Sequence, residues 1–237
     1  MSNYTRLTSG TASFDAMLRR FGVVTVMNVD VFDYDKSIIE GKTAIEIYNA
    51  LYPSENQPTH IRIDTLKVSN ITVEGPSKTV TGGQYSNALI KYGKTARLEM
   101  QDALGNAEAL EMLGGAFIER MGEQVLPFNP DSSDLDGSQD ALHVGSDFCG
   151  AKTLVGDSFF IDQTTGKQVP VKILFYQFMP DSLFNLTQEA DGDAAVFDLN
   201  GDLLTTTIKV GDNAGVPMDH GVFYSIIPAK GYTSING

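Results

Sequence analysis

The chain has 237 residues, 42% hydrophobic and 20% charged, so it can bury a core and does not have the composition of a disordered chain. Its formal net charge of −13, from 30 acidic and 17 basic residues, argues against binding to nucleic acid or to an anionic membrane. The single cysteine, Cys149, excludes a disulfide within the chain.

The first elements in chain order are a strand over residues 22–34 and an ambiguous segment over 43–51. The 22–34 segment is rich in β-branched residues, which favours a strand. In 43–51, Thr43 and Glu46 match a helix capping box, and the apolar residues have helical spacing. Alternation around Ile45 and Ile47 before a turn-rich stretch also fits a strand. We favour a strand paired with residues 60–68.

Residues 60–100 predict three further strands. Apolar residues in 60–74 change parity twice, which predicts bulges near Thr65 and Asn70. Gly82 and Gly83 precede a strand over 84–92, and Tyr92, Gly93 and Lys94 form a turn into a half-buried strand over 95–100.

The remaining pattern predicts one short helix followed by more strands. Asn106 can cap a helix over about 106–113, and Gly114 can end it. Residues 127–140 are rich in Pro, Asp, Ser and Gly and predict a flexible acidic loop. Strands flank a turn at 164–166, and Asn200-Gly201 predicts a tight hairpin. The whole chain, 1–237, is expected to form one mainly β domain.

Candidate catalytic and metal sites are weak. Cys149 follows His143 by six residues, but a buried or interface cysteine explains it better than a Cys–His dyad. Ser132, Asp134 and Asp136 resemble the start of a calcium loop, yet His143 stands at the twelfth position, where a glutamate is required. We therefore expect no enzyme activity, no metal and no cofactor.

An acidic stretch from Asp181 to Ile208 holds six carboxylates and no Lys or Arg. Two carboxylates could serve a glycosidase, but no aromatic platform accompanies them, so a charged turn surface is the better interpretation. The surface residues are Asp191, Asp193, Asp198 and Asp202.

The stretch from Asp64 to Ala116 resembles the major tail tube protein of long-tailed bacteriophages, especially those of Gram-positive hosts. It carries a TGG-x-Y-x-N segment, a YGK segment, an amphipathic strand running into QDALG, and the short helix. A second block, 156–204, is also similar to these proteins. The positions that we expect at turns or assembly contacts are Gly82, Gly83, Tyr85, Asn87, Tyr92, Gly93 and Lys94.

The resemblance implies a β-sandwich or half-barrel of antiparallel strands with one helix and long loops. It implies a structural virion protein, made in the host cytoplasm, that forms stacked and usually hexameric rings. The rings form a tail tube through which genomic DNA passes without specific binding. Other implied partners are the tape measure, tail terminator and baseplate or tail tip proteins; no membrane is involved.

Two further expectations concern charge and an alternative function. Basic residues in 62–97 are expected to contact acidic segments of neighbouring subunits, leaving an acidic lumen. The alternative to a tail tube is a β-sandwich module that binds a host surface or a carbohydrate.

Overall fold

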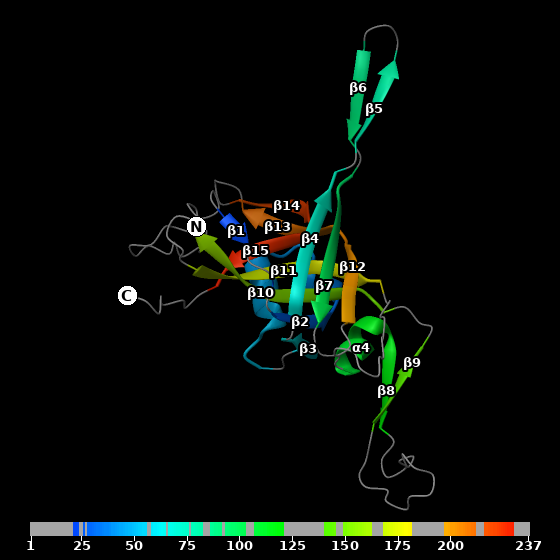
Figure 1. Ribbon diagram of the computed structural model, residues 1–237. Helices are drawn as coiled ribbons and strands as arrows, with labels where there is room; N and C mark the ends of the chain where they lie inside the picture. Colours follow the sequence, from blue (N-terminus) through cyan, green and yellow to red (C-terminus); the bar gives the residue numbers. More distant parts are fainter. Residues whose placement is uncertain are drawn as a thin grey trace, which may run out of the picture.

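The structure is a computed structural model of mainly β character (Figure 1). All pairings between its strands are antiparallel, which confirms the predicted fold class at this level. The described residues are 21–23, 26, 28–55, 58–64, 66–75, 77–82, 86–91, 93–102, 107–120, 140–145, 149–162, 168–181, 197–211 and 216–229.

Strands far outnumber helices along this part of the chain. The helices are α2 (Lys36–Ile39), α3 (Ala44–Leu51) and α4 (Ala107–Gly114). The strands are β1 (Phe21–Val23), β2 (Asn28–Asp33), β3 (His60–Ile63), β4 (Leu66–Glu74), β5 (Ser77–Gly82), β6 (Ser86–Lys91), β7 (Thr95–Asp102), β8 (Ala116–Arg120), β9 (Asp140–Val144), β10 (Lys152–Asp162), β11 (Gln168–Pro180), β12 (Phe197–Leu203), β13 (Thr206–Gly211), β14 (Pro217–Val222) and β15 (Tyr224–Pro228).

A nine-stranded sheet forms the body, with the order β3-β2-β10-β11-β12-β7-β4. β1 adds to the end of β10 that β2 leaves free, and β15 adds to β11 beside β12. Three two-stranded sheets, β13–β14, β5–β6 and β8–β9, complete the described strands. The hairpins β5–β6 and β8–β9 extend away from the body at two ends of the molecule (Figure 1).

The two central strands, β10 and β11, are buried on both faces. Leu154 and Ile173 pack in the larger apolar cluster with residues of β2, β7 and α4. Their neighbours in sequence, Val155 and Leu174, point the other way and pack in a second cluster with α2 and α3. Because both faces are covered, β11 needs no polar alternation, which explains the apolar run KILFYQF.

The expected strand over 43–51 is wrong, because residues 44–51 form helix α3. Thr43 Oγ1 accepts the backbone N–H of Glu46 at 3.3 Å, and the Glu46 carboxylate accepts the N–H of Thr43 at 2.8 Å. This reciprocal capping box satisfies two free donors at the helix start. Ile47 and Leu51, one turn apart, are buried against the sheet.

The first expected strand, 22–34, is divided into β1 and β2. Both strands pair with β10, but the register advances: Val23 lies opposite Phe160 and Asn28 opposite Asp157. The register of β1 on β10 therefore differs from that of β2 by two residues. The predicted helix over 106–113 is confirmed as α4, although α2 and α3 make three helices rather than one in the described chain.

The 60–74 segment breaks once where we expected two bulges. β3 ends at Ile63 and β4 starts at Leu66, and the pairing of β4 with β7 shifts register between Leu66 and Val68. Thr65 lies outside the described residues. The pairing then runs regularly through Asn70 to Glu74, so the second predicted bulge is wrong.

The predicted hairpin at Asn200-Gly201 is also wrong. Both residues lie inside β12, which pairs continuously with β7 from Phe197 to Leu203. A Cβ on Gly201 would collide with the Met179 carbonyl and come within 2.7 Å of the Phe178 ring. Glycine is therefore required by a close approach to β11 and not by a turn.

Several other expectations can be placed. Strands β10 and β11 flank the predicted turn at 164–166. The turn itself lies outside the described residues, as does the predicted acidic loop 127–140 apart from Asp140, which begins β9.

Candidate functional site

Residues 66–102, most of the first block of resemblance (64–116), fold into one long hairpin. β4 pairs with β7, and beyond Gly75 and Gly93 the same two chain segments continue as β5 and β6, which pair with each other. The β5–β6 half projects beyond the body (Figure 1). The residues between Gly82 and Ser86 join the two legs, since these two are the last partners in the ladder.

This topology corrects the predicted turn at residues 92–94. β6 pairs with β5 and β7 with β4, so the chain does not reverse at Gly93. Gly93 and Lys94 are exposed, and a Cβ on Gly93 would meet nothing within 4 Å. Residues 92–94 join two strands on the returning leg of the hairpin.

The other expected assembly positions lie toward the far end of this hairpin. Gly82 ends β5 and lies opposite Ser86, and Asn87 in β6 lies opposite Thr81. Gly83, Tyr85 and Tyr92 lie outside the described residues.

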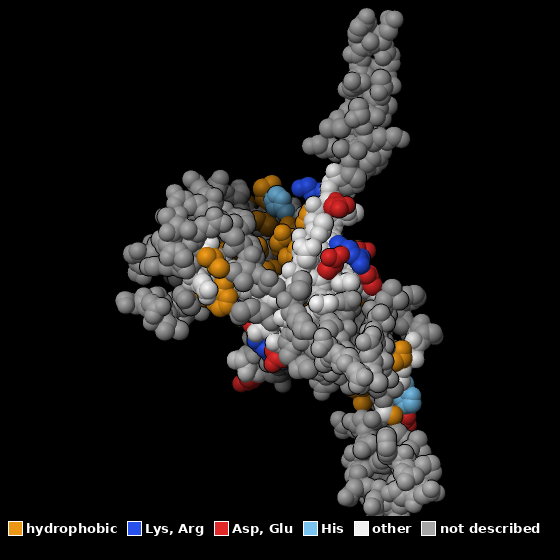
Figure 2. All heavy atoms as spheres, viewed as in Figure 1, with side chains coloured by type: hydrophobic (Ala, Val, Ile, Leu, Met, Phe, Trp, Pro, Cys, Tyr) orange, Lys and Arg blue, Asp and Glu red, His pale blue; other side chains and the backbone are white. Residues whose placement is uncertain are grey.

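An acidic face covers the outer side of β4, β7 and β12. Register places Arg97 beside Asp202 and Glu99 beside Asn200, on the side opposite the buried Leu98. Arg97 contacts three carboxylates: Asp181, Asp202 at 3.2 Å and Glu99 at 3.7 Å. The hydrogen bond that Arg97 donates to Asp181, together with the negative charge of Asp181, raises the pKa of the Arg97 guanidinium. Figure 2 shows the acidic and basic side chains gathered over these strands.

We call this surface the acidic face. Its described ionised side chains are Glu74, Arg97, Glu99, Asp181 and Asp202. The acidic face therefore carries four carboxylates and one guanidinium. Of the predicted acidic surface, Asp202 lies here, Asp198 lies in β12 with its side chain outside the described set, and Asp191 and Asp193 lie outside the described residues.

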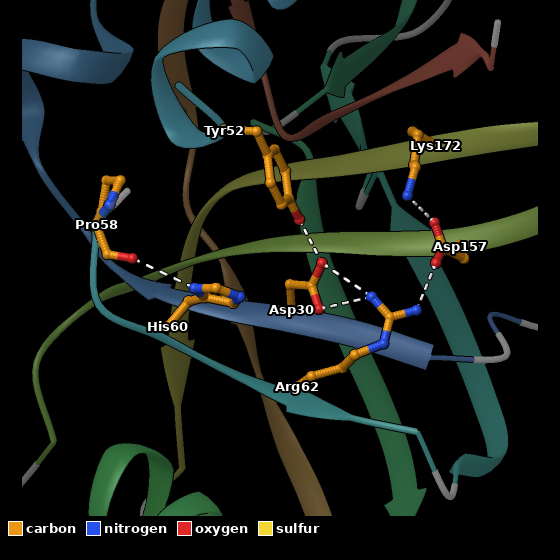
Figure 3. A network of polar contacts seen from close by, with 7 residues as sticks. All are labelled: Asp30, Tyr52, Pro58, His60, Arg62, Asp157 and Lys172. Carbon is orange, nitrogen blue, oxygen red and sulfur yellow. Dashed lines mark hydrogen bonds and ion pairs between the residues drawn. The ribbon is translucent and has the colours of Figure 1, made fainter. Parts of the chain in front are cut away.

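A second polar network, which the sequence did not reveal, joins β2, β3, β10 and β11 (Figure 3). Arg62 Nη1 donates to both oxygens of Asp30, at 3.0 and 3.2 Å, and its Nη2 donates to Asp157 at 3.0 Å. Tyr52 Oη donates to Asp30, and Lys172 pairs with Asp157. The network links four strands around one buried carboxylate.

Burial governs the chemistry of this network. Asp30 is 4% exposed, so its charge requires the donors that surround it. Burial raises the pKa of the Tyr52 phenol, and the hydrogen bond to Asp30 raises it further, so the phenol stays a donor. Burial opposes the charge of Arg62, but Asp30 and Asp157 outweigh it and raise the pKa of the guanidinium. The fixed protonation states indicate a structural role.

Basic residues of 62–97 were expected to contact acidic segments of neighbouring subunits. Arg62 and Arg97 pair with carboxylates of their own chain, and Arg97 does so with the acidic stretch that begins at Asp181. Contacts of the basic residues with neighbouring subunits stay a prediction.

Cys149 and His143 do not form a dyad. His143 Nε2 lies 2.8 Å from Glu119 on the exposed β8–β9 hairpin, whereas Cys149 Sγ donates to the Met112 carbonyl at 2.9 Å. Burial raises the pKa of the Cys149 thiol, the reverse of what a nucleophile needs. The buried cysteine that we preferred is confirmed.

Among the residues that the structure describes, no group of three or more His, Cys, Asp or Glu side chains could hold a metal ion. No described helix is long and apolar enough to cross a membrane.

Neither the protein-family models nor the curated proteins contain a match to this chain.

Proposed function

We propose that this chain is a structural subunit of a bacteriophage tail tube, located in the virion, which assembles with itself into stacked rings. The observation that carries the proposal is the long hairpin of residues 66–102. It contains most of the first of the two blocks that resemble tail tube proteins, and its β5–β6 half projects beyond the body. A projecting two-stranded ribbon is marginally stable alone, so contact with another subunit is its natural support.

The acidic face favours a conduit for DNA. Three carboxylates contact the one arginine of the acidic face, so phosphate finds no free guanidinium there. A surface that lines a channel for duplex DNA must not retain it, because each stable cation–phosphate contact would slow transit. In the proposed tube the acidic face lines the lumen.

The alternative function, a module that binds a host surface or a carbohydrate, lacks a supporting observation. Sugar recognition commonly uses exposed aromatic rings beside polar groups. Among the described Phe and Tyr side chains, Phe117 is the exposed one, and it lies beside His143 on a narrow hairpin. One ring on a narrow hairpin offers no flat aromatic surface against which a sugar could stack.

Electron microscopy of the purified protein tests the proposal. The chain should form rings or tubes as its concentration rises, and sedimentation velocity should show a species several times heavier than the 25.7 kDa monomer. A chain that stays monomeric at high concentration, and is absent from tubes in virions, would rule the proposal out.

A shortened hairpin provides the matched variant. Residues 79–89 can be replaced by Asn-Gly between Lys78 and Ile90, which are partners in the ladder, so β4 and β7 remain paired. The variant should fold with an unchanged far-ultraviolet spectrum yet form no stacked tubes. Normal tubes from this variant would show that the projecting half is not an assembly contact.

A further inference from the structure

Several strands pair on one side only in the part of the chain that the structure describes, among them β4, at the end of the nine-stranded sheet, and β14. The opposite end of the large sheet, β3, packs against α4. The outer side of β13 is taken by the segment 41–43, since Gly41 N donates to Thr207 O at 3.1 Å and Lys209 N to Lys42 O at 2.9 Å.

The direction of the open groups on β14 follows from those two bonds. Thr207 and Lys209 turn their backbone groups away from β14, so their partners Gly221 and Asp219 also turn away from β13. Asp219 and Gly221 therefore present N–H and C=O groups to the open side. Pro217 has the same parity, and its missing N–H costs no bond to β13.

The same reasoning fixes the open groups on β4. Asp181 N donates to Asn200 O at 2.8 Å, so Asn200 turns toward β11 and its partner Glu99 turns toward β4. Glu99 and its β4 partner Asn70 then bond to each other. By alternation, Ile71 and Val73 turn their backbone groups outward.

Both edges are suited to accept another strand. β4 is nine residues long and contains no proline, and Val73 is 44% exposed. β14 is exposed along its first five residues, and Met218 is 53% exposed. Natural proteins cover or blunt such edges, because unpaired backbone groups and apolar side chains attract other strands.

Charge and symmetry together decide which edge of one copy pairs with which edge of the next. Two β4 edges brought together would juxtapose two acidic faces, each with Glu74 and Glu99 on its outer side. β14 carries no such excess, because Asp219 lies opposite Lys209 across the ladder. Like-charge repulsion therefore disfavours β4 with β4, and a pairing of β14 with β14 would close as a dimer, so β4 with β14 is the pairing that can repeat around a ring.

We propose that β14 of one copy pairs with β4 of the next copy, head to tail, through Asp219 and Gly221 on one side and Ile71 and Val73 on the other. The pairing rests on the proposed self-assembly and names the strands that carry it. Because the two surfaces differ, a pair of copies still has one free β4 and one free β14. The same contact can therefore repeat around a ring.

Proline variants test the two edges separately. Asp219→Pro removes an outward N–H of β14, and Val73→Pro removes one of β4, while the bonds within each subunit remain. Each variant alone should lose the ring and sediment as a monomer. An equimolar mixture should form heterodimers, because the first variant keeps β4 intact and the second keeps β14.

Controls separate folding from assembly. Asp219→Asn keeps the N–H and should assemble like the wild type, whereas His220→Pro removes an inward N–H and should lower Tm. Hydrogen exchange on the wild type supplies a measurement without variants: peptides covering 66–74 and 217–222 should become protected when monomers assemble.

The outcomes distinguish the two proposals. A wild-type chain that never assembles contradicts the proposed function and this pairing together. Rings formed by either proline variant, or no protection of the two peptides on assembly, overturn the pairing and leave the proposed function standing. Variants that fold and yet form no heterodimer when mixed also overturn it.

Discussion

Arg62 and Asp30 face each other across β3 and β2, where the guanidinium donates to both carboxylate oxygens at 3.0 and 3.2 Å. Asp30 is almost fully buried, whereas the side chain of Arg62 is 46% exposed. The buried carboxylate therefore needs Arg62 as a donor more than the half-exposed guanidinium needs Asp30. Removal of Arg62 should consequently lower the free energy of unfolding by a measurable amount.

Arg62→Ala should lower the free energy of unfolding by about 2 to 4 kcal/mol, because it leaves a buried carboxylate with Tyr52 as its remaining donor in the network. Denaturant unfolding monitored by circular dichroism measures the loss. Lys36→Ala is the matched control, since its pair with Glu40 is exposed and should contribute less than about 0.5 kcal/mol. Equal losses in the two variants would contradict the importance of burial.

Gly201→Ala should destabilise the chain by about 1 to 3 kcal/mol or more, because the new methyl group would overlap the Met179 carbonyl and the Phe178 ring. Gly93→Ala is the control, since its Cβ would meet nothing within 4 Å. Thermal unfolding of both variants compares them directly. A larger loss at Gly93 than at Gly201 would show that the two glycines have the reverse roles.

These glycines also show how far the sequence could lead. The strict alternation of Ala96, Leu98 and Met100 predicted β7 and its buried face correctly, because a half-buried strand must alternate. The dipeptide Asn200-Gly201 is typical of a hairpin turn, yet the glycine allows close contact with a strand that precedes it by more than twenty residues. The local sequence cannot distinguish a turn from a close approach that tertiary packing sets.

The segment 44–51 shows a second limit. Its apolar residues fit both the helical and the strand period, and the capping box at Thr43 and Glu46 decides in favour of the helix. The buried Asp30 had a weaker signal: a carboxylate between two valines in the strand NVDVFD, both faces of which are covered. Its partners Arg62 and Asp157 lie far away in sequence, so only the fold brings them together.

The capping box predicts a pH dependence. Hydrogen bonds that the backbone N–H and the hydroxyl of Thr43 donate hold the pKa of the Glu46 carboxyl below its ordinary value. A lowered folded-state pKa contributes stability above the unfolded-state pKa, and that contribution is lost as the pH falls through the folded-state value. Between about pH 5 and about pH 3, the wild type should therefore lose more stability than Glu46→Gln.

Glu46→Gln is informative because glutamine can still close a capping box but has no charge to titrate. Thr43→Ala, which removes the cap, should cost about 1 kcal/mol at neutral pH. Chemical unfolding at several pH values gives both results. Parallel pH profiles for the wild type and Glu46→Gln would show that this carboxylate is not coupled to folding.

The last prediction concerns DNA and depends on the neutralisation of Arg97. Assembled wild-type tubes should not retain short duplex DNA at about 0.15 M salt, because Asp181, Asp202 and Glu99 occupy the guanidinium. The double variant Asp181→Asn and Asp202→Asn removes two of these carboxylates in every subunit. Its tubes should bind duplex DNA, with an affinity that falls as salt rises.

Co-sedimentation of labelled duplex with tubes measures this retention. Glu40→Gln with Glu55→Gln is the matched control, because it removes the same charge from exposed residues outside the acidic face. If both double variants bind DNA equally, net charge and not Arg97 controls retention. Tight, salt-sensitive binding by wild-type tubes would show that the lumen is not the acidic face, while the assembly of the chain into tubes would be unaffected by that result.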